Sequence, residues 1–190
     1  MYLQNQHYII TTFVETMPPL EQFDIVHNPN NTNTEDFYMA RIFRAESVDA
    51  LPRTIALVDL LCPGYEPFAV LEKDRLMVIL FDSIIRINLS TGLIEEMIEC
   101  DSMGGLHEIH SIDNGYIIWG EGDIFRYDLK LNRIWYFMGR DILVSPEKNK
   151  SFWIEDDLIH CMDFLGWHYV LDFDGKLIHS FPEDNIHHLT

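Results

Sequence analysis

Cysteine is scarce in this chain of 190 residues. Its three cysteines, Cys62, Cys100 and Cys161, form neither an even-numbered framework nor a Cys-x-x-Cys pair. Free, buried thiols in a reducing compartment are the expected state. The chain also has no apolar run near the ~20 residues that span a bilayer, and its first residues lack the basic region of a secretory signal. These absences predict a cytoplasmic protein.

Positive charge is equally scarce, with 13 Lys and Arg residues against 31 Asp and Glu residues and a net charge of −18. Binding to nucleic-acid phosphates or to an anionic membrane is disfavoured, because like charges repel. A magnitude of roughly 2–8 is enough to keep a small domain soluble. The excess predicts a basic protein as partner, since complementary potentials speed encounter and reject wrong partners.

Signatures of catalysis are missing as well. The chain has no Gly-x-Ser-x-Gly nucleophile turn. The fragment Gly120-Glu121-Gly122 carries an acid where a phosphate loop would hold its anion, and a hairpin turn explains it. The sequence therefore indicates no cofactor and no catalytic residue.

One pattern is present three times, at residues 85–92, 125–132 and 170–175. Apolar residues recur two apart, which is the period of a strand with one buried face. Each copy then has an Asn or Asp before a polar turn, namely Asn88, Asp128 and Asp172. We expect these three side chains to accept hydrogen bonds from backbone amides of the turn, a structural role.

The surrounding sequence divides into units of forty-odd residues, at about 67–101, 105–140 and 141–181. Each contains four short apolar runs separated by polar turns, of which Asn114-Gly115 is a strong hairpin signal. Four short antiparallel strands per unit resemble a β-propeller blade. The resemblance covers residues 67–181 and lacks the Gly-His and Trp-Asp dipeptides of the tryptophan–aspartate repeats. It implies an all-β fold of tandem four-stranded meanders, which is either propeller-like with four small blades or an open curved meander.

Residues 1–63 are a β-rich segment that could supply a divergent blade. Its strand-like runs lie at 8–15, 22–27, 37–44 and 53–61. A soft boundary at Pro63-Gly64 separates this segment from the three repeats of 64–190. The length suits one compact domain.

Nine histidines raise the question of a metal site. His107 and His110 are three apart, so on a strand they point to opposite faces and cannot share one ion. A second group brackets a predicted turn, and its spacing matches no recognised zinc motif. It supplies only weak metal candidates, which are His160, Cys161, Asp163 and His168.

Large side chains at the rim of a scaffold are typical of binding hot spots, Trp and Arg above all. On this ground the candidate partner-binding residues are Trp135, Arg140, Trp153 and Trp167, together with the acidic run Glu155-Asp156-Asp157. Arg86 and Arg126 occupy equivalent repeat positions and are expected to pair with acids on neighbouring strands.

The leading hypothesis is a non-enzymatic, acidic protein-binding module. In general character the chain resembles bacterial immunity proteins, which neutralise a cationic toxin domain, although no motif carries that resemblance. One alternative is a hydrolase with an acid or a His-bound metal in a pocket at the repeat rim. The other is a structural scaffold without a discrete ligand.

Overall fold

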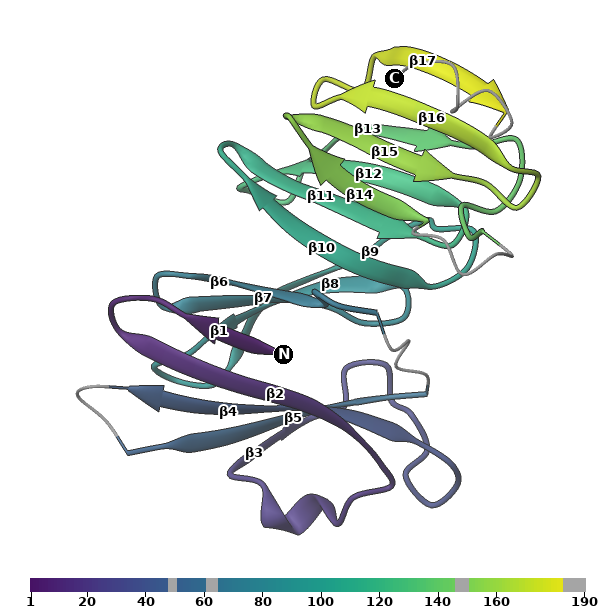
Figure 1. Ribbon diagram of the computed structural model, residues 1–190. Helices are drawn as coiled ribbons and strands as arrows, with labels where there is room; N and C mark the ends of the chain where they lie inside the picture. The colour runs from purple at the N-terminus through teal and green to yellow at the C-terminus, as the bar shows by residue number, and fades with distance from the viewer. Residues whose placement is uncertain (48–50, 61–64, 146–150, 183–190) are drawn as a thin grey trace. The chain divides into compact units, whose positions relative to one another are not determined.

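The computed structural model describes residues 1–47, 51–60, 65–145 and 151–182. Its elements are β-strands and one short 3-10 helix, Leu20–Gln22. Figure 1 shows the strands as a succession of antiparallel sheets along the chain. The all-β prediction is confirmed, while the predicted boundary at Pro63-Gly64 and the thiol of Cys62 lie outside the described residues.

The first sheet differs from the expected meander. It has the order β1-β2-β4-β5-β3, with bounds β1 Tyr2–Gln4, β2 Tyr8–Thr16, β3 Ile25–His27, β4 Met39–Ser47 and β5 Arg53–Asp59. Four of these strands form an antiparallel meander, and β3 joins the edge of β5 in parallel. The run at 22–27 was expected between the runs at 8–15 and 37–44, but β2 pairs directly with β4, and the fourth antiparallel strand is Tyr2–Gln4 at the edge beside β2. The sequence did not reveal this strand, because three residues give almost no periodic signal.

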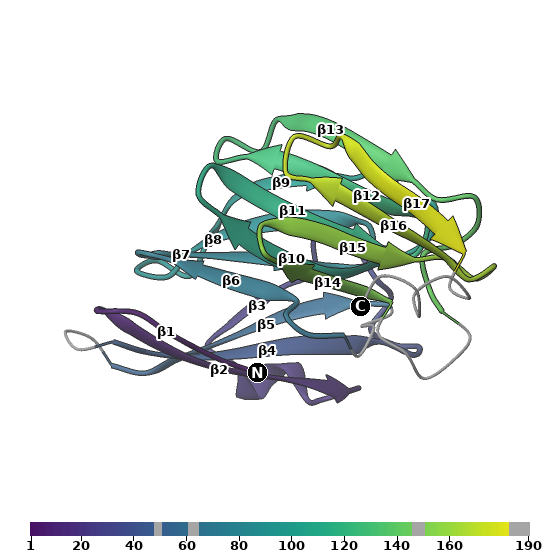
Figure 2. The ribbon, with the colours of Figure 1, turned by 45° about the horizontal axis from the view of Figure 1, so that its top comes forward.

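The three repeats form three four-stranded antiparallel sheets, each in sequence order. The first sheet contains β6 Ala69–Glu72, β7 Arg75–Ile79, β8 Ser83–Asn88 and β9 Ile94–Glu99. The second contains β10 Leu106–Ile112, β11 Gly115–Gly120, β12 Asp123–Asp128 and β13 Arg133–Met138. The third contains β14 Phe152–Glu155, β15 Leu158–Met162, β16 Trp167–Asp172 and β17 Leu177–Pro182. Each predicted repeat thus contains one four-stranded antiparallel sheet (Figure 2).

The repeated Asn or Asp has the structural role expected of it. Asn88 accepts hydrogen bonds from the amides of Ser90 and Thr91, each at 3.0 Å. The carboxylate of Asp128 accepts from the amides of Lys130 and Asn132 at 2.8 Å. The carboxylate of Asp172 accepts from the amides at positions 174 and 176 at 3.0 and 2.9 Å. One side chain thus closes the turn between the third and fourth strands in each repeat.

Burial divides the strands into inner and outer ones. All residues of β11 are buried, as are Leu76–Ile79 of β7, so both faces of these strands are covered. The fourth strands β13 and β17 are largely exposed. A strand covered on both faces reads as a continuous apolar run, which explains why strict alternation fails in the inner strands.

Contacts between residues divide the chain into two compact units. Unit 1 comprises Met1–Cys100 and Leu106–Ile109, and unit 2 comprises Asp101–Gly105 and the residues from His110 on. In unit 1 the buried Arg41 guanidinium lies 4.2 Å from the centre of the Phe68 ring. In unit 2 the indole of Trp119 stacks on Phe152, with 5.5 Å between ring centres. Each unit thus joins its sheets through a large buried side chain.

Candidate functional site

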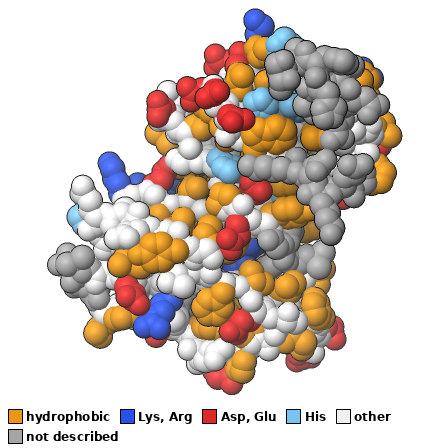
Figure 3. All heavy atoms as spheres, in the orientation of Figure 1, with side chains coloured by type: hydrophobic (Ala, Val, Ile, Leu, Met, Phe, Trp, Pro, Cys, Tyr) orange, Lys and Arg blue, Asp and Glu red, His pale blue; other side chains and the backbone are white. Residues whose placement is uncertain are grey.

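An acidic cleft lies at one end of the two sheets of unit 2, where the β10–β11, β14–β15 and β16–β17 turns meet. Its volume is about 650 Å³, and its wall includes Ile154 and Phe173. Three exposed carboxylates come from three different hairpins: Asp113 from β10–β11, Asp157 from β14–β15 and Asp174 from β16–β17. Figure 3 shows acidic side chains gathered at this end of the unit. Three like charges around one opening favour the approach of a cationic group.

Arg126 is the one Lys or Arg among the described residues that line this cleft. Its guanidinium donates to the carbonyl oxygen of Phe173 at 2.7 Å. The prediction that Arg126 pairs with an acid on a neighbouring strand is therefore wrong, because residue 135 opposite it on β13 is a tryptophan. For Arg86 the same prediction is confirmed by a 2.6 Å ion pair with Glu96, the residue opposite it on β9.

Trp135, a predicted contact for a partner, lies against the neighbouring turn of its own unit. Its indole N–H donates to the carbonyl oxygen of Phe173 at 3.0 Å. Gly175 follows with a φ of +80°, and a Cβ there would come within 2.7 Å of the indole ring. Glycine is required at this position for both reasons. Trp135 therefore fastens the β16–β17 turn that carries Asp174.

Arg140 and Trp167, two further candidates, form a pair. The Arg140 guanidinium lies 3.6 Å from the centre of the Trp167 ring, within the range of a cation–π contact. The Arg140 amide donates to the Tyr169 hydroxyl at 3.0 Å, and that hydroxyl donates to Asp163 at 2.6 Å. Burial raises the pKa of Tyr169 to about 12, so the hydroxyl keeps its proton at neutral pH. These hydrogen bonds fix the backbone at Arg140, whose exposed side chain contacts the half-buried Trp167.

Trp153 belongs to an aromatic cluster with two histidines on the last sheet. Its indole stacks on His160, with ring centres 4.9 Å apart and planes 8° from parallel. His160 Nδ1 and His168 Nε2 are 3.2 Å apart, a hydrogen bond whose direction depends on the tautomers. Burial and, in smaller part, the neighbouring His160 lower the pKa of His168 to about 4, and burial also lowers the pKa of His160. The histidine pair is therefore neutral at physiological pH.

The acidic run at 155–157 forms the hairpin between β14 and β15. Glu155 pairs with Leu158 across a two-residue turn. Asp156 and Asp157 have φ values of 49° and 59°, the left-handed region that Asp tolerates better than most residues. All three side chains are exposed, and Asp157 is the one that lines the cleft. Of the predicted partner-binding residues, the structure brings Asp157 to this site and places the others around the same unit.

The four weak metal candidates do not converge. Neighbours on a strand point to opposite faces, so His160 and Cys161 diverge. Burial raises the pKa of the Cys161 thiol, which disfavours the thiolate that binds metals. Asp163 is buried and accepts from the amides of residues 165 and 167 and from Tyr169. Within the described residues no group of three or more His, Cys, Asp and Glu side chains could hold a metal ion.

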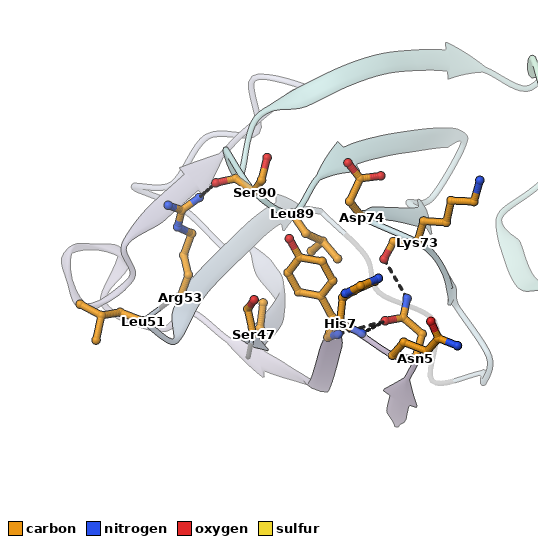
Figure 4. A pocket seen from close by; sticks show the side chains of 12 residues that line it. Asn5, His7, Ser47, Leu51, Arg53, Lys73, Asp74, Leu89 and Ser90 are labelled. Atoms are coloured by element: carbon orange, nitrogen blue, oxygen red, sulfur yellow. Dashed lines mark hydrogen bonds between the residues drawn. The ribbon is translucent and has the colours of Figure 1, made fainter. Parts of the chain in front are cut away.

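A second cavity lies in unit 1, and no pattern in the sequence predicted it. It measures about 740 Å³ and lies where the β1–β2, β6–β7 and β8–β9 turns meet the end of β4 and the start of β5 (Figure 4). Its basic side chains are Arg53 and Lys73, with His7 beside them. The residues come from turns up to about eighty positions apart, so periodicity could not reveal their convergence. The one available signal was the rarity of Lys and Arg in this chain.

Comparison with known proteins identifies no family. No protein-family model matches the chain, and no curated protein matches it. None of the described residues belongs to a helix with the length and apolar character needed to cross a membrane.

Solved structures do match the fold. The computationally designed Ika8 protein is 8% identical, with a TM-score of 0.54 over 77% of this chain and 46% of that one. BamB from Moraxella catarrhalis is 12% identical, with a TM-score of 0.47 over 80% of this chain and 48% of that one. Hsv2 from Kluyvelomyces marxianus is 9% identical, with a TM-score of 0.45 over 76% of this chain and 48% of that one.

The chain thus spans about half the length of the solved structures it matches. At these identities the likeness concerns the fold alone and transfers no activity, substrate or partner. The chain is an all-β protein that contains repeated four-stranded antiparallel sheets.

Proposed function

We propose that this protein is a non-catalytic binding module for a basic partner protein. The observation that carries the proposal is the acidic cleft of unit 2, with Asp113, Asp157 and Asp174 at its mouth. A lysine or arginine side chain of the partner would replace water there and offset three like charges. The net charge of −18 would attract the partner over a longer range.

Exposed side chains elsewhere on unit 2 would supply the other component of a protein interface. Tyr136 and Ile134 on β13 are 59% and 57% exposed, and Arg140 lies on Trp167. Exposed aromatic residues and Arg provide most of the binding energy in typical interfaces, while the charges set the rate and the specificity. An inhibitor of the immunity type, which covers a basic surface of a toxin domain, would use both components.

The test is a charge-neutral triple variant, D113N/D157N/D174N, used as bait in a lysate of the native host. Asn keeps the size of Asp and tolerates the left-handed backbone at position 157. The wild type is expected to retain a basic protein at low salt and release it at high salt. The triple variant is expected to retain at least tenfold less of that protein, measured by quantitative mass spectrometry.

The matched control is E15Q/E21Q/E35Q, three exposed acids of unit 1 that remove the same net charge. It is expected to retain the partner nearly as well as the wild type does. Equal losses in both variants would mean that overall charge alone attracts the partner and would contradict the assignment to the cleft. Retention that is independent of salt would contradict the electrostatic proposal as a whole.

A further inference from the structure

We infer that the cavity of unit 1 binds a small anionic molecule, a carboxylate or phosphate ester carried on an apolar or aromatic body. The proposed partner surface belongs to unit 2, so this inference stands independently of it. The cavity volume of about 740 Å³ falls within the range of small-molecule sites, roughly 300–1,000 Å³.

The walls of the cavity are fixed before any ligand arrives. The amide nitrogen of the Asn5 side chain donates to the Lys73 carbonyl oxygen at 2.8 Å, which ties the β1–β2 turn to the β6–β7 turn. The Leu89 amide donates to the Asp74 carbonyl oxygen at 2.8 Å, and Arg53 donates to the Ser90 carbonyl oxygen at 3.0 Å. Three turns and the start of β5 are therefore held together by hydrogen bonds that span as many as 68 positions. Such preorganisation lowers the entropic cost of binding.

The floor of the cavity is apolar. Ala45 and Leu89 are buried there, and the half-buried Tyr8 adds an aromatic ring. The backbone around Tyr8 is fixed, because the Asn5 side-chain oxygen accepts from the amides of His7 and Tyr8 at 2.9 Å. An apolar body of the ligand would gain the burial energy, and the polar rim would orient it.

The rim of the cavity is basic, which is unusual in this chain. Arg53 and Lys73 are two of only 13 Lys and Arg residues, and they lie on different sides of the opening in Figure 4. Asp74 is the one carboxylate among the described lining residues. Its negative charge also acts on its neighbour Arg75, whose pKa is raised chiefly by Glu95 and in smaller part by Asp74. Among the described lining residues two cations thus stand against one carboxylate, within a strongly negative protein.

Hydrogen-bond donors complete the anion site. The Arg53 guanidinium gives one nitrogen to Ser90 and has a planar fork that suits carboxylate and phosphate oxygens. The ring of His7 is a further potential donor in the lining, whereas the Ser90 hydroxyl already donates to the Asn88 side-chain oxygen at 2.6 Å. Together the rim selects a negative head group and the floor selects an apolar body.

The test uses three probes of similar size: benzoate, phenyl phosphate and the neutral benzyl alcohol. Each is titrated into the full-length protein while the amide signals of residues 73, 74 and 90 are followed by NMR. Benzoate or phenyl phosphate is expected to shift these signals and to bind at least fivefold more tightly than benzyl alcohol. Tighter binding of one anion supports the inference and identifies whether the ligand is a carboxylate or a phosphate.

Three variants locate the charge effect. K73N removes a cation and places Asn at a φ of +51°, which Asn tolerates well, so it should fold and weaken anion binding about fivefold. R53Q should weaken anion binding more than K73N does. If R53Q fails to fold, K73N alone tests the loss of a cation. D74N removes the carboxylate and should strengthen anion binding about threefold. These opposite signs are expected only when the anion lies at this rim.

The matched control is R44Q, which removes the same charge from an exposed side chain that is paired with Glu46. R44Q should leave the affinity for the anionic probes within twofold of the wild type. Benzyl alcohol binding as tightly as both anions, or K73N and R53Q behaving like R44Q, would overturn the inference. So would the absence of any shift at residues 73, 74 and 90.

Discussion

The two units present opposite charges at the same place in the fold. In unit 1 the hairpin turns at one end of its sheets surround a cavity with Arg53 and Lys73 at the rim. In unit 2 the corresponding turns surround a cleft with Asp113, Asp157 and Asp174. Each site lies where turns of two neighbouring sheets meet. The scaffold therefore creates a hollow in each unit, and the residues of the turns and strands that line it set its charge.

This difference in charge arises because some positions of a repeat are needed for folding and others are not. The strands and the Asn or Asp of the turn are needed for folding in every copy. The neighbouring turn positions face solvent and carry no such constraint. Ser90 follows Asn88 by two positions and Asp174 follows Asp172 by two, and these two residues line opposite kinds of site. The four predictions below test how far the likeness of the two scaffolds extends.

The largest effect is expected from the buried aromatic residue that joins the sheets of each unit. W119A in unit 2 removes a side chain that is 2% exposed, stacked on Phe152 and hydrogen-bonded to the Leu143 carbonyl oxygen. F68A in unit 1 removes a ring that is 3% exposed and lies under Arg41. Each change should lower the free energy of unfolding by about 3–5 kcal/mol. Urea denaturation measures this loss. A loss below about 1 kcal/mol in either variant would contradict the idea that both units depend on one buried aromatic residue.

The next effect is a loss of stability in acid from one buried histidine in each unit. Burial lowers the pKa of His107 and that of His168 to about 4. Between pH 6.5 and 4 the unfolded chain takes up protons that the folded protein excludes, so the free energy of unfolding falls as the pH falls. Above pH 6.5 both states are neutral and this contribution is constant. The loss should be about 3 kcal/mol for each histidine.

Variants H107F and H168F keep an aromatic ring and remove the titration. Each should flatten the dependence of stability on pH between 6.5 and 4, measured by urea denaturation at a series of pH values. H7F, at an exposed position, is the control and should leave the profile unchanged. A profile that H168F leaves as steep as that of the wild type would show that His168 is not buried in its neutral form.

A smaller effect is expected at the turn-closing residues. N88A in unit 1 and D172A in unit 2 each remove the acceptor of two backbone amides. Each should cost about 1 kcal/mol, and D172A should cost more because an ionised acceptor bonds more strongly. Thermal unfolding at neutral pH gives the comparison. D174A, two positions later and exposed, should be nearly neutral, and an equal cost there would contradict the special role of position 172.

The smallest effect concerns two left-handed turn residues. Lys73 has a φ of +51° and Asp157 a φ of +59°. Glycine relieves the steric cost of this conformation, so K73G should stabilise the protein by about 0.5–1 kcal/mol. D157G should change little, since Asp already tolerates the conformation. Thermal unfolding resolves the difference, and a larger gain at position 157 would reverse the expected order.

Much of the fold could be predicted from the sequence because its signals are local. Alternating apolar residues, the Asn or Asp of the turns and the spacing of forty-odd residues identified three four-stranded sheets. The Arg86 pairing followed from register alone. The same reasoning missed Tyr2–Gln4, which is too short to show a period, and misplaced Ile25–His27, whose parallel pairing with β5 depends on distant residues.

The candidate sites were predictable only in part. The excess of acidic residues indicated a surface for a basic partner, and Asp157 does line the acidic cleft. Trp135 and Trp153 looked like surface anchors, yet one donates to Phe173 and the other stacks on His160. Side chains of this size can lie outward or against a neighbouring turn, and the strand period cannot tell which. His160 and His168 meet because they lie diagonally on adjacent strands, a contact set by register.

The sequence by itself determined the all-β class, the repeat, the closing of the turns and the negative charge, because each depends on residues close together in the chain. The tertiary structure decided which turns meet, and with them the acidic cleft and the basic cavity. Their lining residues are far apart in sequence, and only the packing of one sheet beside another brings them together. The turns therefore supply charged side chains to both sites, and the fold decides where those side chains meet.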